Sequence, residues 1–148
     1  MASTYFVAEL ECPVCGTRSP ADESTDIVTP LLPEGPAFLA VGDRADEITW
    51  ATVSHWYPVL REPEPGEPIK LLETWVCPNC GAENWVRITL DDGVVAAIEA
   101  VPLTRETILD AHAIATEVER LYRERTGENL FLDREHPRGF RDRLLAAL

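Results

Sequence analysis

Two matching pentapeptides, Cys12-Pro13-Val14-Cys15-Gly16 and Cys77-Pro78-Asn79-Cys80-Gly81, hold every cysteine of this 148-residue chain. In each, a Cys-x-x-Cys pair is followed directly by glycine, which is the layout of a zinc knuckle. The proline presets φ at the start of a tight turn, and the glycine can take the positive φ that ends it. Two such pairs supply four thiolates, the complete tetrahedral shell of a structural Zn²⁺. The predicted ligands of a single zinc are Cys12, Cys15, Cys77 and Cys80.

The competing interpretation is two redox-active Cys-x-x-Cys pairs. A redox pair normally opens a helix, whose N-terminus lowers the thiol pKa. Here both pairs lie between segments of β character. The 61 residues between Cys15 and Cys77 exceed the spacing of a compact zinc ribbon, but a shared metal would join the knuckles whatever the intervening chain does. One zinc is therefore favoured, and its closed shell leaves no position for a catalytic water.

Composition and charge restrict the class of protein. The hydrophobic fraction of 45% is that of a globular chain, and the net charge is −13. Residues 1–103 hold 5 basic and 17 acidic side chains, whereas a nucleic-acid-binding zinc ribbon needs a basic face. No apolar run approaches the roughly 18 residues of a membrane span, and the first residues carry no secretory signal. We therefore expect a cytoplasmic location without a membrane or nucleic-acid partner.

Up to residue 102 the pattern favours antiparallel β-structure around the metal. Strands are predicted over residues 4–10, 47–60, 69–76, 83–90 and 94–101, with a short one within 26–32. The strand over 47–60 rests on its many β-branched and aromatic residues. Asp91-Asp92-Gly93 predicts a tight turn before the last strand, and the proline-rich connector 61–68 cannot be an interior strand.

From Thr104 the pattern changes to helical periodicity. Thr104 suits an N-cap and Gly127 a C′ position. Between them an apolar stripe repeats every three or four residues, at Ile108, Ala111, Ala115, Val118 and Tyr122. The prediction is one long amphipathic helix, followed by a short helix that begins at Pro137. The expected fold is α+β, with a zinc-ribbon-like antiparallel domain over 1–102 and a helical arm over 103–148 packed on it.

The last helix is the candidate partner surface. It carries an apolar face with arginines beside it, made by Phe140, Leu144, Leu145, Leu148, Arg138 and Arg141. An apolar terminal helix must bury this face. The covering surface is either the chain's own sheet or a groove on another chain, where an amphipathic helix docks through such residues. For the arginines, the favoured interpretation is a solvated face balanced by nearby acids.

No catalytic constellation emerges from the remaining polar residues. His55, His112 and His136 lie in separate segments, and each is favoured as a packed or surface residue. Asp91 and Asp92 beside Gly93 are typical of a turn. An enzyme would therefore need a pocket built from residues far apart in the sequence.

The paired Cys-Pro-x-Cys-Gly knuckles with their long spacer resemble the bacterial CpXC family, which is named for this duplicated motif. The resemblance covers the ten knuckle residues and implies that their four cysteines bind zinc. It implies no activity, because the function of that family is not established.

These observations favour a non-enzymatic zinc-binding adaptor or assembly subunit that contacts a protein partner or a second copy of itself. The alternative is a nucleic-acid- or transcription-associated zinc ribbon.

Overall fold

An antiparallel meander of three strands forms the centre of the computed structural model, which describes residues 4–32, 38–130 and 137–148. The strands are β4 (Ile69–Val76), β5 (Glu83–Asp91) and β6 (Val94–Val101). The second knuckle lies between β4 and β5. Asp92 and Gly93 turn from β5 to β6 with φ of 49° and 79°, the two positive values that a tight hairpin requires. The three strands predicted here are confirmed.

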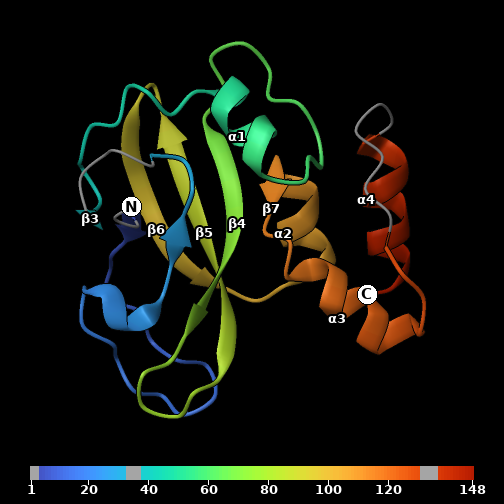
Figure 1. Cartoon of the computed structure of the whole chain (residues 1–148), viewed down its shortest axis with the longest axis horizontal. Helices are drawn as coiled ribbons and strands as arrows, with labels where there is room; N and C mark the ends of the chain where they lie inside the picture. The colour runs from blue at the N-terminus through green and yellow to red at the C-terminus, as the bar shows by residue number, and fades with distance from the viewer. Residues whose placement is uncertain (1–3, 33–37, 131–136) are drawn as a thin grey trace.

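The fold is α+β, with two mixed sheets and four helices among the described residues (Figure 1). The larger sheet has the order β6-β5-β4-β7, where β7 is Ala113–Ile114. The smaller sheet has the order β2-β1-β3, made by Val28–Thr29, Thr4–Phe6 and Phe38–Leu39. The helices are α1 (Trp50–Trp56), α2 (Arg105–Asp110), α3 (Val118–Thr126) and α4 (Pro137–Ala146), and a 3₁₀ turn covers Glu23–Thr25. No described helix has the length and apolar character needed to span a membrane.

The larger sheet is buried on both faces. Leu71 and Trp75 of β4 pack with Ile88 and Ile98 in one core, which the N-terminal half of the chain covers. Leu72 points to the other face and packs in a second core with residues of α2, α3 and α4. Figure 1 shows these three helices on one side of the sheet and β1 to β3 on the other. Because successive side chains of a strand alternate between faces, one strand serves both cores.

The predicted strand over 47–60 is wrong, because residues 50–56 form α1. Trp50, Val53 and Tyr57 have helical spacing and pack in the first core, together with Ile48 just before the helix. Trp56 remains half exposed. The β propensity of these residues is overridden because a short helix buries one apolar stripe while an alternating strand would split it between two faces.

The long helix predicted from Thr104 to Gly127 is also wrong. The chain leaves the helical conformation after Asp110, and Ala113 and Ile114 pair in parallel with Leu71 and Leu72. A second parallel pair joins β1 to β3, so the prediction of purely antiparallel sheets is corrected as well. The predicted apolar stripe is buried, but Ile108 lies on α2, Val118 and Tyr122 lie on α3, and Ala111 and Ala115 lie on either side of β7. Hydrogen bonds to β4 replace those that a continuous helix would have made.

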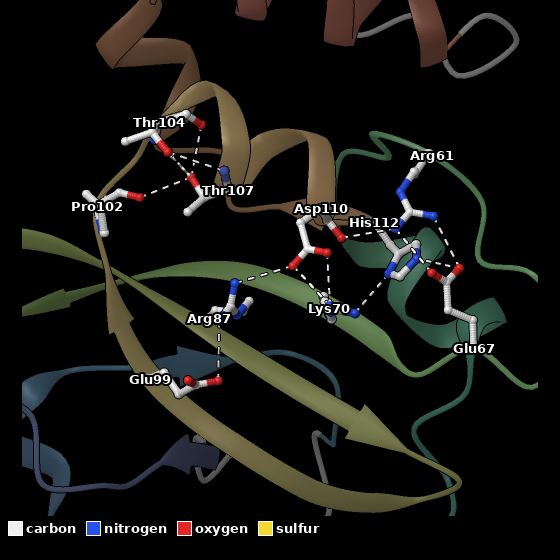
Figure 2. A network of polar contacts seen from close by, with 10 residues as sticks. All are labelled: Arg61, Glu67, Lys70, Arg87, Glu99, Pro102, Thr104, Thr107, Asp110 and His112. Atoms are coloured by element: carbon white, nitrogen blue, oxygen red, sulfur yellow. Dashed lines mark hydrogen bonds and ion pairs between the residues drawn. The ribbon is translucent and has the colours of Figure 1, made fainter.

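His112 secures this break in the helix (Figure 2). Its backbone N–H donates to the Lys70 carbonyl at 2.9 Å, and its Nδ1 accepts from the Lys70 N–H at 2.9 Å. Nε2 therefore carries the proton, and it lies 3.1 Å from Glu67 Oε1. Burial lowers the pKa of His112, and Arg61 lowers the pKa of Glu67 to about 2. A neutral imidazole thus donates to an ionised carboxylate.

Asp110, the last residue of α2, ties the helix to β4 and β5 on the helix-covered face of the sheet (Figure 2). Its carboxylate lies 2.9 Å from Lys70 Nζ and 3.3 Å from Arg87 Nη1. Arg87 also contacts Glu99 of β6 at 3.5 Å. These half-buried charges are paired across three strands and a helix. They help to fix how α2 is oriented on the sheet, over the apolar core beneath them.

A buried polar triad joins the smaller sheet to β4. Tyr57 Oη donates to Glu73 Oε2 at 2.8 Å and lies 3.0 Å from Thr29 Oγ1. The Thr74 N–H donates to the other oxygen of Glu73 at 3.0 Å. Burial raises the pKa of Glu73 to about 7. The protein therefore holds an acid that is neutral under mildly acidic conditions and must ionise inside the protein as the pH rises.

The pH dependence of stability should report on Glu73. A pKa raised from 4.5 to about 7 favours the protonated folded state. Its contribution is complete below pH 4.5 and is lost as the pH rises through 7, and this loss amounts to about 3 kcal/mol. Relative to Glu73→Gln, the wild type should lose this much unfolding free energy across that window, measured by urea denaturation at several pH values. Parallel pH curves for the two proteins would contradict the assignment.

Candidate metal centre

The two knuckles adopt the same turn twice. Gly16 N–H donates to the Cys12 carbonyl and Gly81 N–H to the Cys77 carbonyl, each at 2.8 Å. Both glycines have a φ of 76°, a conformation that side chains disfavour. The first cysteine of each turn also donates its N–H to the residue after the glycine, at 3.0 Å for Thr17 and 2.9 Å for Ala82. The two copies of the sequence motif therefore adopt the same turn conformation.

Different supports bring the knuckles together. The second knuckle is the tip of the β4–β5 hairpin, while the first follows Leu10 in a ribbon closed by Ser19. Ser19 donates its N–H to the Leu10 carbonyl at 2.8 Å, and its Oγ accepts from the Leu10 N–H at 3.1 Å. In Figure 1 the two loops lie side by side at the bottom of the view. The metal centre therefore lies where the N-terminal segment meets the end of the larger sheet.

The four sulfurs fit one metal ion. All lie within 4.8 Å of one another, with Cys12 Sγ 3.7 Å from Cys80 Sγ and Cys15 Sγ 3.6 Å from Cys77 Sγ. Sulfurs about 2.3 Å from a tetrahedral zinc lie about 3.8 Å apart, whereas a disulfide bond is about 2.05 Å long. The cysteines are free thiols at the spacing of a metal shell, consistent with a zinc site. Cys12 and Cys77 are buried, and Cys15 and Cys80 face solvent.

Two asparagines that the sequence analysis missed donate to the cluster. Asn84 Nδ2 lies 3.6 Å from Cys12 Sγ, and Asn79 Nδ2 lies 3.6 Å from Cys15 Sγ and 3.1 Å from Thr17 Oγ1. Asn79 stands inside the second knuckle and reaches the first. Asn84 pairs with Trp75 across the hairpin and is buried. Such donors orient ligands and stabilise thiolate charge.

The thiols do not ionise alike. Hydrogen bonds from Thr17 and Asn79 lower the pKa of Cys15 to about 5, and backbone N–H groups, that of Cys15 first, lower the pKa of Cys12. The Ala82 N–H favours the Cys80 thiolate, but desolvation and the adjacent sulfurs raise the pKa of Cys80 to about 12. A divalent cation would offset the repulsion between neighbouring thiolates. Its binding would therefore release the protons that remain on the thiols.

Each histidine is predicted to be either a packed or a surface residue, and the structure contains one of each kind among the described residues. His112 is fully buried in the network with Glu67, and His55 is exposed beside Trp56, with ring centroids 5.0 Å apart. His136 lies outside the described residues. Asp91 and Asp92 begin the β5–β6 turn as predicted.

The structure places the candidate partner residues of the last helix in the chain's own second core. Phe140, Leu144 and Leu145 are buried there, and Leu148 packs against them half-buried. Arg105 of α2 donates to the Leu145 carbonyl at 2.6 Å. Arg141 is half-buried, and the Arg138 side chain is outside the described residues. Contact with another chain through the same apolar side chains would require them to leave this core.

Phe140→Ala measures how far the last helix supports the fold. Removing a fully buried phenylalanine should lower the unfolding free energy by about 3–5 kcal/mol. Leu109→Ala is the control, because Leu109 is a large apolar residue on α2 that is half exposed, and it should change stability little. Thermal or chemical denaturation of both variants makes the comparison. Equal, small effects would indicate that α4 is held only weakly on the second core.

The chain matches no known family model, no curated protein and no solved structure. The resemblance to the CpXC family therefore rests on the ten knuckle residues.

Proposed function

We propose that this protein is a non-enzymatic adaptor or assembly subunit whose fold is fastened by one structural Zn²⁺. The observation that carries the proposal is the cluster of four cysteine sulfurs at the spacing of a closed tetrahedral shell. A catalytic zinc keeps a coordination position for water or substrate, whereas four protein sulfurs fill every position. The metal would thus connect chain segments and perform no reaction.

The place of the cluster supports a fastening role. The first knuckle is joined to the second by a span of 61 residues, and it follows a strand of only three residues. Among the described residues, the backbone hydrogen bonds of residues 4–20 lead to the smaller sheet, to Ile27 or within the N-terminal ribbon, not to the larger sheet. A metal shared between the knuckles would fix the N-terminal ribbon against the β4–β5 hairpin, so the binding energy of the metal becomes folding energy.

The two acids whose pKa values are most displaced, Glu67 and Glu73, also support the non-enzymatic interpretation. Both oxygens of Glu73 already accept hydrogen bonds, from Tyr57 and Thr74. The Glu67 carboxylate is engaged by Arg61 and His112. Structural networks perturb pKa values as active sites do, and these two networks connect separate segments of the fold.

The charge distribution supports a protein partner over nucleic acid. Each of the five basic residues between positions 1 and 103 forms an ion pair with a carboxylate, namely Arg18, Arg44, Arg61, Lys70 and Arg87. The chain as a whole carries −13, and four thiolates with one Zn²⁺ make it more negative. Phosphate contacts need unpaired cations on one face.

The experiment that tests the metal assignment compares the purified wild type with Cys77→Ser. The wild type should contain about one zinc per chain, and its four thiols should resist a thiol reagent until a chelator or denaturant is added. Cys77→Ser should lose zinc affinity and unfold at lower denaturant concentration, because it opens the shell between two distant segments. Full labelling of the native wild type, or zinc below stoichiometry after metal loading, would contradict the proposal.

A nucleic-acid binding assay distinguishes the adaptor from the alternative, a nucleic-acid-associated zinc ribbon. The zinc-loaded protein should pass through a heparin column and show no measurable affinity for duplex DNA or single-stranded RNA at physiological salt. Phosphate would be repelled, because the chain carries −13 before the thiolates and the metal are counted. Fluorescence anisotropy with labelled oligonucleotides provides the measurement. A submicromolar affinity that falls steeply with salt would favour a nucleic-acid-associated zinc ribbon instead.

A further inference from the structure

The two edges of the larger sheet are covered to different extents. On the β7 side, Ile114 N–H donates to the Pro58 carbonyl and Leu60 N–H to the His112 carbonyl, so residues 58–60 cover that edge. On the β6 side, Val95 exchanges hydrogen bonds with Gly42 and Asp43 at 2.7 and 2.9 Å. From residue 96 to 101 the described chain supplies no backbone partner to β6 other than β5. A free edge of this kind is a template for another strand.

A groove of about 780 Å³ runs beside this free part of β6. Its apolar lining is provided by Leu10, Pro13, Trp85, Ile98, Val101 and Pro102. Consecutive residues of β6 from Ile98 to Val101 line the groove, and their side chains alternate between the two faces of the sheet. The groove therefore follows the strand edge, where an added strand would lie about 4.8 Å away.

The first knuckle forms the opposite wall of the groove. Glu11 forms an antiparallel bridge with Arg18, flanked by the hydrogen bonds from Ser19 to Leu10 and from Cys12 to Thr17. In that pattern the N–H and C=O of Glu11 itself point away from the ribbon. Cys12 and Gly16 line the same wall. The metal centre thus positions one side of the groove.

Charge selects the occupant. The groove is bordered by Glu9, Glu11 and Glu99 against one cation, Arg18. Glu9 pairs with Arg18 at 3.1 Å and Glu99 with Arg87 at 3.5 Å, which leaves the carboxylate of Glu11 to set the negative character of the border. A second copy of this chain would bring another −13 to the same acidic border. A basic segment is complementary to it.

We propose that the free edge of β6 and the adjoining groove bind an extended basic segment of a partner protein, which joins the larger sheet as a further strand. Its backbone pairs with residues 97–101, its apolar side chains enter the groove, and its lysines or arginines meet Glu11 and Glu99. This inference rests on the adaptor function proposed above and names its partner surface.

The test uses the full zinc-loaded chain and a fluorescein-labelled peptide of alternating valine and lysine. Fluorescence anisotropy should give a micromolar affinity, and a peptide of alternating valine and glutamate should not bind. On addition of the lysine peptide, amide hydrogen exchange should slow at alternate residues within 97–101 of β6, because the N–H groups that point away from β5 gain acceptors.

Matched charge reversals locate the site. Glu11→Lys with Glu99→Lys should weaken peptide binding about tenfold or more, with the zinc content unchanged. The control pair, Glu83→Lys with Glu128→Lys, alters the net charge equally at exposed positions outside the groove and also breaks one ion pair, that of Glu83 with Arg120. It should bind within twofold or so of the wild type. Removing zinc should abolish binding, because one wall of the groove is then released.

Three results would overturn the assignment. Equal weakening by both pairs of reversals would mean that only net charge attracts the peptide. Binding without protection of residues 97–101 would place the peptide elsewhere, and protection that grows with protein concentration in the absence of peptide would make a second copy the occupant. In each case a stoichiometric zinc and an inert thiol set would leave the adaptor proposal standing, so the two failures are distinguishable.

Discussion

β4 is the strand around which both cores are built, and much of the remaining structure packs against it. β5 pairs with it along its whole length, and β7 pairs with it at Leu71 and Leu72. The side chains of Leu71 and Leu72 enter different cores, and the end of the strand leads directly into Cys77. Where a strand is buried on both faces and both edges, its backbone polar groups must be satisfied within the protein. Residues 112–115 satisfy those of residues 70–72 on the β7 side, and this requirement interrupts the helical segment that contains them.

The polar side chains between the helices and the larger sheet are paired for the same reason, because burial requires partners for them. Lys70 and His112 exchange backbone and ring hydrogen bonds, and Asp110 holds Lys70 and Arg87 at the end of α2. Removing one partner from such a set leaves a half-buried group without its hydrogen bond, which costs more than the pair contributes. On the opposite face, buried polar groups are paired in the same way in the triad of Tyr57, Glu73 and Thr29. Within this triad, Glu73 is neutral or charged according to pH.

The metal centre and the free edge of β6 share a wall. The first knuckle contributes Cys12 to the sulfur cluster and also lines the groove beside β6. A metal that orders the knuckle would also order the groove, which would link metal binding to the surface proposed for the partner. Asn79 strengthens the link, because it crosses from the second knuckle to Thr17 and Cys15 of the first.

The sequence by itself determined the features that depend on neighbouring residues. The knuckles and the Asp92-Gly93 hairpin follow from turn geometry, and the meander follows from alternation within each strand. Only the tertiary structure decided that residues 50–56 are helical, that the chain extends at Ala113, and that Phe140 is buried within the same chain. Each of these depends on a surface supplied from far along the chain. His112 has no local reason to leave a helix, and its partners Glu67 and Lys70 lie more than forty residues earlier.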